Sequence, residues 1–385
     1  MCMSLIIRNA VICNPNRQFK GDILIEDGDI TKVGCIDENG DITLDASGRL
    51  VFPGFIDLHI QGAGGADVLD AKPEALHIIS KTCAKFGVTS FLATTVYRPR
   101  KSNKHFSSAV KAHKQGLKGA RFLGFHLEGP FISPKKKGMI RFTSICKPSL
   151  DIFENIIEDT HGFLRMMTIA PELEGSTEII ERLVKHSIIP SFGHSSASYE
   201  ETLRGFEAGI SHVTHLFNAM NPIHHRSPGP LLAIFESGNI TAQIISDGVH
   251  IVPPMIKFAV SVMGINRLVL ITDGMRALGL PEGKYLYDGQ EFISYKGTAR
   301  YLDGTLIGTT LGINNLAERF LKFTGVFLCS ISRVASLNPA KVLGLSDKKG
   351  RIEPGVDADI TILNRDFTVW KTIVEGRIVF DSQNF

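Results

Sequence analysis

Apolar and polar residues alternate in short segments at both ends of the chain, a pattern typical of β-strands. Near the N-terminus the Asp27-Gly28 pair predicts a hairpin turn, and Glu375-Gly376 predicts another near the C-terminus. The predicted strands are Leu5–Ile12, Asp22–Glu26, Ile30–Val33, Asp41–Leu44, Ala358–Leu363, Val369–Val374 and Ile378–Phe380. Because neither end is expected to enclose a core alone, we predict one small β-sandwich domain built from residues 1–52 plus 346–385.

Between these ends, apolar runs alternate with segments that have apolar residues at helical spacing. Residues 73–86 show that spacing, and Ser198–Glu201 is a capping box that opens another helix. The apolar runs end near His59, Val96, Glu128, Ala170, His194, His215, Asp247 and Asp273. Eight strands alternating with helices predict an α/β fold, a (β/α)8 TIM-like barrel over residues 53–345. An open doubly wound sheet is the alternative, but Gly62–Gly65 only weakly resembles the phosphate-binding loop that it would normally carry.

Four of the predicted strands end in side chains that can bind a metal ion or transfer a proton. In barrel enzymes the active site lies at this end of the strands. Glu128, His194 and His215 would form a three-ligand set that leaves a position for water, as in catalytic zinc sites. Asp273 could accept a proton from that water and pass it to a leaving amine. The sequence therefore predicts one divalent ion, with zinc expected and iron, manganese or cobalt as alternatives.

These residues also have structural interpretations. Glu128 precedes Gly-Pro and could stabilise a turn, and Gly193-His194-Ser195 is a common loop string. A long polar loop follows His215, and its Arg226 suits a phosphate or a carboxylate at the rim of a site. Arg226 could instead brace its own loop. His250, in the segment that begins at Asp247, offers a second donor.

Composition excludes several other classes of protein. The net charge of +3, without a basic stripe, argues against nucleic acid as a partner. No apolar run approaches the roughly 18 residues of a membrane span. The six cysteines have no paired spacing, which argues against a disulfide framework and against a cysteine-bound metal. We expect a protein of the cytoplasm.

Several strings in this order resemble known motifs. Pro53-Gly54-Phe55-Ile56-Asp57-Leu58-His59 resembles the entry motif of the amidohydrolase superfamily. Within that superfamily the chain is similar, nearly end to end, to the N-acetylglucosamine-6-phosphate deacetylases. The similarity lies in His126–Pro130, Gly193–Ser195, His215–Met220, His224–Gly229, Asp247–His250, Thr272–Asp273, Gly304–Gly308 and Gly355–Asp359.

The resemblance implies a role for each matching residue. It implies a metal ion on Glu128, His194 and His215, with Asp273 as the general acid and base. It implies that Arg226 and His250 recognise the sugar phosphate, often with this pair supplied by the neighbouring subunit of a homodimer. The residues implied to line the sugar are Asn218, Ala219, Asp247, Leu306, Ile307 and Gly308.

The chain departs from the family pattern at two places. Members with two metal ions usually carry His-x-His on the first strand, where this chain has His59-Ile60-Gln61. An amide is a poorer ligand than imidazole, so we expect one ion, with His59 as a candidate second-site ligand. Members also commonly have a histidine that polarises the acetyl carbonyl where this chain has Ile140, next to Met139 in the predicted substrate site.

We therefore predict an enzyme, a metal-dependent hydrolase that removes the N-acetyl group from N-acetylglucosamine 6-phosphate. One alternative is the same reaction on another acylated amino-sugar phosphate, such as N-acetylgalactosamine 6-phosphate. A second is a sugar-phosphate-binding protein of this fold without catalysis, which Ile140 keeps open.

Overall fold

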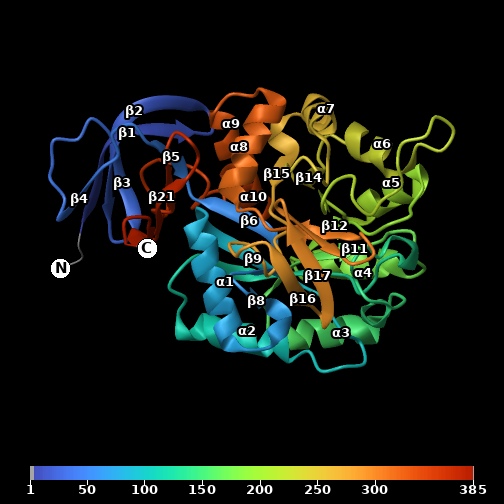
Figure 1. Cartoon of the computed structure of the whole chain (residues 1–385). Helices are drawn as coiled ribbons and strands as arrows, with labels where there is room; N and C mark the ends of the chain where they lie inside the picture. The colour runs from blue at the N-terminus through green and yellow to red at the C-terminus, as the bar shows by residue number, and fades with distance from the viewer. Residues whose placement is uncertain (1–3, 385) are drawn as a thin grey trace.

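The computed structural model describes residues 4–384 and confirms that both ends of the chain build one small β domain. Its sheet has the strand order β22-β21-β20-β5-β1-β2-β3, with β4 paired to β1. N-terminal and C-terminal strands therefore lie together at one side of the molecule (Figure 1). The strands are β1 (Leu5–Asn14), β2 (Arg17–Glu26), β3 (Asp29–Gly34), β4 (Ile42–Asp45), β5 (Leu50–Pro53), β20 (Ile360–Leu363), β21 (Val369–Val374) and β22 (Arg377–Asp381).

The core of this domain comes from both ends of the sequence. Ile12 and Val51 from the N-terminal part are buried with Ile360 and Ile373 from the C-terminal part. Since β5 pairs antiparallel with β20, neither end completes the sheet without the other. The exact boundaries, 1–52 plus 346–385 against 53–345, remain a prediction.

The middle of the chain forms the predicted barrel. Eight parallel strands follow one another in the order β15-β14-β13-β12-β11-β10-β9-β6. The barrel closes where Ile60 bridges Gly274 and the Asp273 amide donates to the His59 carbonyl at 2.9 Å. The barrel strands are β6 (Phe55–Ile60), β9 (Val88–Thr95), β10 (Arg121–Glu128), β11 (Leu164–Ile169), β12 (Ile189–Phe192), β13 (His212–Val213), β14 (Thr241–Ile244) and β15 (Leu268–Leu270).

Helices surround the barrel (Figure 1). Ser198 caps α5 with both hydrogen bonds of the predicted capping box. The helices are α1 (Pro73–Lys85), α2 (Lys104–Gln115), α3 (Leu150–Asp159), α4 (Ser176–Lys185), α5 (Tyr199–Ala208), α6 (Gly229–Glu236), α7 (Pro253–Met263), α8 (Ile313–Thr324), α9 (Cys329–Ser332) and α10 (Asn338–Val342), with a π-helical turn at Arg333–Leu337. Within residues 4–384 no helix combines the length and the apolar character needed to cross a membrane.

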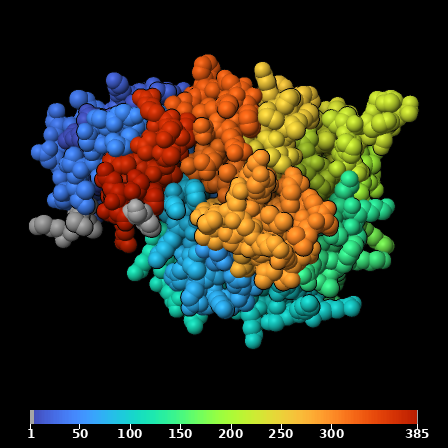
Figure 2. Space-filling model, viewed as in Figure 1, coloured from blue at the N-terminus to red at the C-terminus, as the bar shows by residue number. Residues whose placement is uncertain are grey.

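A four-stranded antiparallel sheet follows the last barrel strand and is absent from the sequence prediction. It consists of β16 (Gly283–Tyr287), β17 (Gln290–Tyr295), β18 (Thr298–Tyr301) and β19 (Leu306–Thr309). Phe292 and Ile307 of this sheet are buried together with Ile132 and Ile140. Figure 2 shows this insert, in orange, on the front of the molecule over the barrel. The insert therefore covers the loop that follows Glu128.

Candidate active site

Three of the predicted ligands meet at the mouth of the barrel. The ligand atoms of Glu128, His194 and His215 lie within 4.8 Å of one another. Glu128 Oε1 is 3.1 Å from His194 Nε2 and 3.3 Å from His215 Nε2, and the two ring nitrogens are 3.0 Å apart. All three side chains are buried. Their donor set, one carboxylate and two imidazoles with open coordination positions, fits a catalytic divalent ion.

The backbone and the surrounding groups orient the two histidines. His194 and His215 both adopt positive φ, 48° and 30°, where the chain turns sharply as it leaves strands β12 and β13. His194 Nδ1 donates to the Lys136 carbonyl at 2.8 Å, which leaves the Nε2 lone pair free for a metal ion. The amide N–H of His215 donates to Gln243 Oε1 at 3.3 Å. The geometry thus presents Nε2 of both rings to Glu128.

Electrostatics favour the ionised carboxylate at this site. Burial alone would raise the pKa of Glu128. The charge on His59 and the ring nitrogens of His194 and His215 outweigh burial and lower that pKa well below its ordinary value. Burial also lowers the pKa of His215, which keeps its ring neutral. An anionic carboxylate with a neutral imidazole is the protonation state that binds a cation.

Asp273 lies beside this group, as the sequence predicts. The backbone of Asp273 has φ 48° and is hydrogen-bonded to β6 and to β19. The Asp273 N–H donates to the His59 carbonyl, and the Asp273 carbonyl accepts from the Thr309 N–H, each at 2.9 Å. Asp273 Oδ1 is 3.3 Å from His59 Nε2 and accepts a hydrogen bond from Gln61 Nε2 at 3.0 Å. The carboxylate is thereby held within the same cluster as Glu128.

His59 is also part of the cluster. Its Nε2 is 3.6 Å from Glu128 Oε1, and its Nδ1 lies 3.0 Å from Gln243 Oε1. Burial lowers the pKa of His59, but the charges of Glu128 and Asp273 raise it to about 9 overall. His59 is therefore positioned beside two carboxylates, although it does not join the three-ligand group.

Asp247 and His250 form a pair. Asp247 Oδ2 accepts from His250 Nδ1 at 2.6 Å, and its Oδ1 accepts from the backbone of Val249 and of His250, each at 2.8 Å. Burial would raise the pKa of Asp247, but these hydrogen bonds lower it below its ordinary value. His250 Nε2 is 4.0 Å from Asp273 Oδ2 in the same subunit. The pair thus aims the His250 ring at the candidate acid and base.

Five other predicted substrate residues lie on the insert or in the core beneath it. Leu306, Ile307 and Gly308 lie on β19, whose Thr309 bonds to Asp273. A Cβ on Gly308 would come within 2.4 Å of the Asp273 carbonyl, so only glycine allows this approach. Met139 and Ile140 are buried in the core under the insert.

The loop after β13 carries the remaining predicted residues. Asn218 donates its backbone N–H to the His215 carbonyl at 2.9 Å, and the Ala219 carbonyl accepts from Ser195 at 3.1 Å. Arg226 lies farther along this loop, between α5 and α6, and is exposed. Among residues 4–384 its guanidinium has no hydrogen bond or ion pair, so it does not brace its own loop.

Sequence reasoning missed three groups that orient the site. Gln243, on β14, contacts His59 and His215. Because it stands within an apolar run, the sequence analysis treated it as part of a buried strand. Asp57 accepts from Thr272 Oγ1 at 2.5 Å and ties the first strand to the last. Lys136 orients His194 through its main-chain carbonyl, and every residue type has such a carbonyl, so the sequence could not show this contact. A polar residue within an apolar strand was the available signal for Gln243 and Asp57.

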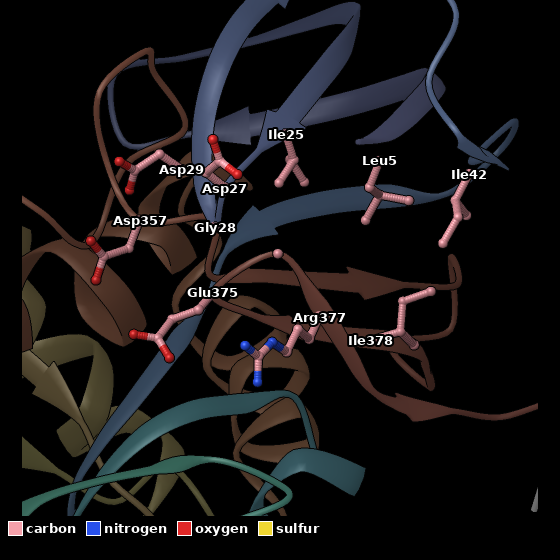
Figure 3. A pocket seen from close by; sticks show the side chains of 11 residues that line it. Leu5, Ile25, Asp27, Gly28, Asp29, Ile42, Asp357, Glu375, Arg377 and Ile378 are labelled. Atoms are coloured by element: carbon pink, nitrogen blue, oxygen red, sulfur yellow. The ribbon is translucent and has the colours of Figure 1, made fainter. Parts of the chain in front are cut away.

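A cavity outside the barrel mouth lies elsewhere in the molecule. It measures about 700 Å³, is located in the small β domain, and contains none of the predicted site residues (Figure 3). Its carboxylates Asp357 and Glu375 are already paired, with Lys349 and Arg121 respectively. The lining residues are Leu5, Ile25, Asp27, Gly28, Asp29, Ile42, Asp357, Glu375, Gly376, Arg377 and Ile378. Its lining lacks the convergent metal ligands of the barrel mouth.

Comparison with known proteins identifies the family. The amidohydrolase family matches residues 50–379. The N-acetylglucosamine-6-phosphate deacetylase of Bacillus subtilis (strain 168) is 36% identical over 100% of this chain and 99% of its own length. The N-acetylgalactosamine-6-phosphate deacetylase of Escherichia coli O157:H7 is 31% identical over 86% of this chain and 88% of its own.

A solved structure of a protein with the same name as the first of these relatives is also similar to this chain. It is the N-acetyl-D-glucosamine-6-phosphate deacetylase of Mycobacterium smegmatis in complex with N-acetyl-D-glucosamine-6-phosphate. It superposes with a TM-score of 0.90 at 29% identity and covers 98% of this chain and 99% of its own. The similarity in sequence and in structure therefore covers both the barrel and the small β domain. The chain therefore belongs to the amidohydrolase family, among its N-acetylglucosamine-6-phosphate deacetylases.

Proposed function

We propose that this protein is a metal-dependent deacetylase that hydrolyses N-acetylglucosamine 6-phosphate to glucosamine 6-phosphate and acetate. The observation that carries the proposal is the convergence of Glu128, His194 and His215 within 4.8 Å of one another, beside Asp273. The relatives named for this reaction align over nearly the whole chain. Zinc is the proposed ion, one per subunit, because this donor set with open positions is typical of catalytic zinc.

The reaction requires water to attack the acetyl carbon while the C–N bond breaks and the nitrogen gains a proton. A divalent ion held by Glu128, His194 and His215 would supply Lewis-acid chemistry, which makes water more acidic, with a pKa of roughly 7, and polarises a carbonyl. Asp273 then takes the proton from the attacking water and delivers it to the leaving nitrogen. Asp247 fixes the ring of His250, which lies nearest to Oδ2 of Asp273, whereas Gln61 and His59 lie nearest to its Oδ1. Acetate and the free amine are the products.

Ile140 affects how the carbonyl is activated. Its side chain is 1% exposed and packs with Ile132 and Met275, so it offers no hydrogen-bond donor to a substrate. Polarisation of the acetyl carbonyl would then be supplied by the ion that Glu128, His194 and His215 would hold, or the substrate differs from the one usual in the family. The retained metal ligands and Asp273 favour catalysis over the alternative of a binding protein.

The proposal extends to assembly and location. Arg226 is exposed on a projecting loop without a partner for its guanidinium in residues 4–384, as expected for a residue that completes a phosphate site across a homodimer. We propose the cytoplasm as the location, since Cys13, Cys35, Cys83, Cys146 and Cys329 are all free thiols.

Acetate release tests the assignment directly. We expect the purified, zinc-loaded protein to release acetate from N-acetylglucosamine 6-phosphate with a higher kcat/KM than from N-acetylgalactosamine 6-phosphate or unphosphorylated N-acetylglucosamine. A preference for the galactosamine compound would select the second sugar as substrate. Absence of acetate release from all three by a metal-loaded protein would contradict the proposal and favour a binding role.

The phosphate specificity should depend on Arg226. We expect Arg226→Ala to raise KM for N-acetylglucosamine 6-phosphate by roughly 10- to 100-fold, because a hydrogen bond to a charged group is worth about 1.5–3 kcal/mol. Its KM for unphosphorylated N-acetylglucosamine should stay unchanged. Arg204→Ala, at an exposed arginine of neighbouring α5, is the matched control. Equal effects on both sugars would remove Arg226 from phosphate recognition.

A further inference from the structure

Glu172 lies in the loop after β11, the barrel strand between β10, which ends in Glu128, and β12, which leads to His194. β11 itself supplies none of the three candidate ligands. Oε2 of Glu172 accepts a hydrogen bond from the Ser195 hydroxyl at 2.6 Å. Its Oε1 accepts from the Ser196 N–H at 2.6 Å and from the Ser196 hydroxyl at 3.0 Å. All three donors therefore belong to the two residues directly after His194.

The backbone at His194 needs such support. His194 has φ 48°, a left-handed conformation that residues other than glycine keep only where the surrounding structure fixes it. Hydrogen bonds to a carboxylate are short and roughly twice as strong as those between neutral groups, and the 2.6 Å bond from Ser195 is of this kind. Glu172 thus holds the turn from which the His194 ring faces Glu128.

A second path of hydrogen bonds leads from Glu172 to the ring of His194. The Ser196 hydroxyl lies 3.0 Å from the Ser133 hydroxyl. Ser133 donates its N–H to the His194 carbonyl, and the Ser133 carbonyl accepts from the Lys136 N–H, each at 2.9 Å. The Lys136 carbonyl in turn accepts from His194 Nδ1. Ser196 and Ser133 therefore connect Glu172 to the segment that fixes the ring.

The residues after His194 are also tied to the loop that follows His215. Ser195, which is fully buried, donates its N–H to the Ala219 carbonyl at 3.1 Å. Asn221 Nδ2 donates to the Ser196 carbonyl at 2.8 Å. The loops after β10, β12 and β13 therefore meet at the two serines that Glu172 binds.

We propose that Glu172 is a positioning residue for the metal centre, which holds the His194 turn so that Nε2 of the ring keeps facing Glu128. This inference rests on the proposed metal-dependent function and assigns a role to the end of a strand that supplies no ligand. A carboxylate that only braced its own loop would accept hydrogen bonds from that loop. The three donors to Glu172 instead come from Ser195 and Ser196, next to a candidate ligand.

Zinc affinity tests the proposal without relying on activity. The dissociation constant for Zn²⁺ would be measured on the full-length protein and its variants by competition with a chromophoric chelator. We expect Glu172→Ala to bind zinc about 10- to 100-fold more weakly, the usual effect of removing a group that orients a metal ligand. Glu172→Gln should retain most of the affinity, because its amide oxygen can still accept from Ser196. Glu174→Ala, at an exposed glutamate of the same loop, is the matched control and should leave the dissociation constant unchanged.

Cobalt gives a second readout that a purely structural role would not change. The visible absorption bands of the Co²⁺-substituted protein depend on the geometry of its ligands, so they should shift in Glu172→Ala and stay unchanged in Glu174→Ala. Unchanged zinc affinity and cobalt bands in Glu172→Ala, even with a lower melting temperature, would overturn the proposal. If Glu172→Ala fails to fold, Ser195→Ala decides, because it removes one of the three donors. Weaker zinc binding by Ser195→Ala would support the proposal, and unchanged binding would overturn it.

The outcomes separate this inference from the proposed function. Unchanged zinc binding in Glu172→Ala would remove the role of Glu172 and leave the deacetylase assignment intact. Absence of bound zinc in the unmodified protein would contradict the metal centre itself, and this inference with it.

Discussion

Replacing Asp273 with asparagine is expected to lower kcat by roughly 100- to 10,000-fold, the usual contribution of general acid–base catalysis. Asparagine keeps the shape of the side chain but cannot accept the proton of the attacking water. Asp273 lies outside the three-ligand group, so the Asp273→Asn variant should still bind its ion. Steady-state acetate release and zinc content, measured on the same preparation, check both halves of this prediction.

The matched control is Asp37→Asn, at an exposed aspartate of the small β domain. It removes a carboxylate of the same type from the small β domain, outside the barrel, and should leave kcat unchanged. Full activity of Asp273→Asn would show that another group transfers the proton, and His250 would be the next candidate because its Nε2 is 4.0 Å from Asp273 Oδ2. Loss of zinc from Asp273→Asn would instead assign Asp273 to the metal shell.

Removing a ligand should have the second large effect. We expect His215→Ala to lose its zinc and to lower kcat/KM by roughly a thousand-fold or more, since a Lewis-acid ion is worth several kcal/mol and each 1.36 kcal/mol is tenfold in rate. Dialysis against a chelator should inactivate the unmodified protein to the same extent, and added zinc should restore only that protein. His186→Ala, at an exposed histidine after α4, is the control. A His215→Ala variant that retained both zinc and activity would contradict the predicted ligand set.

The rings of the two candidate ligands His194 and His215 are held in different ways. His194 Nδ1 is held by the Lys136 carbonyl, whereas His215 Nδ1 is buried without a partner in the described chain. Orientation of the His215 ring therefore depends more on the turn at His215 than on a hydrogen bond to Nδ1.

The barrel and its candidate ligands could be predicted because their signals are local. An apolar run that stops at Glu128, His194, His215 or Asp273 marks both a buried strand and the end at which its polar side chain emerges. All eight predicted strand ends fall at or within a few residues of the ends of observed barrel strands. The insert of β16–β19 escaped prediction because its short strands lie between the last barrel strand and α8, where the alternation of strands and helices predicts only a connection.

The sequence by itself determined which residue types stand at the strand ends, and therefore the metal chemistry that this protein can support. Only the tertiary structure decided how those residues face one another. Closure of the barrel between Ile60 and Gly274 brings Gln61 against Asp273, although the two are far apart in the chain. The physical reason is that periodicity specifies the face on which a side chain lies, whereas its distance to a partner depends on strand order and register.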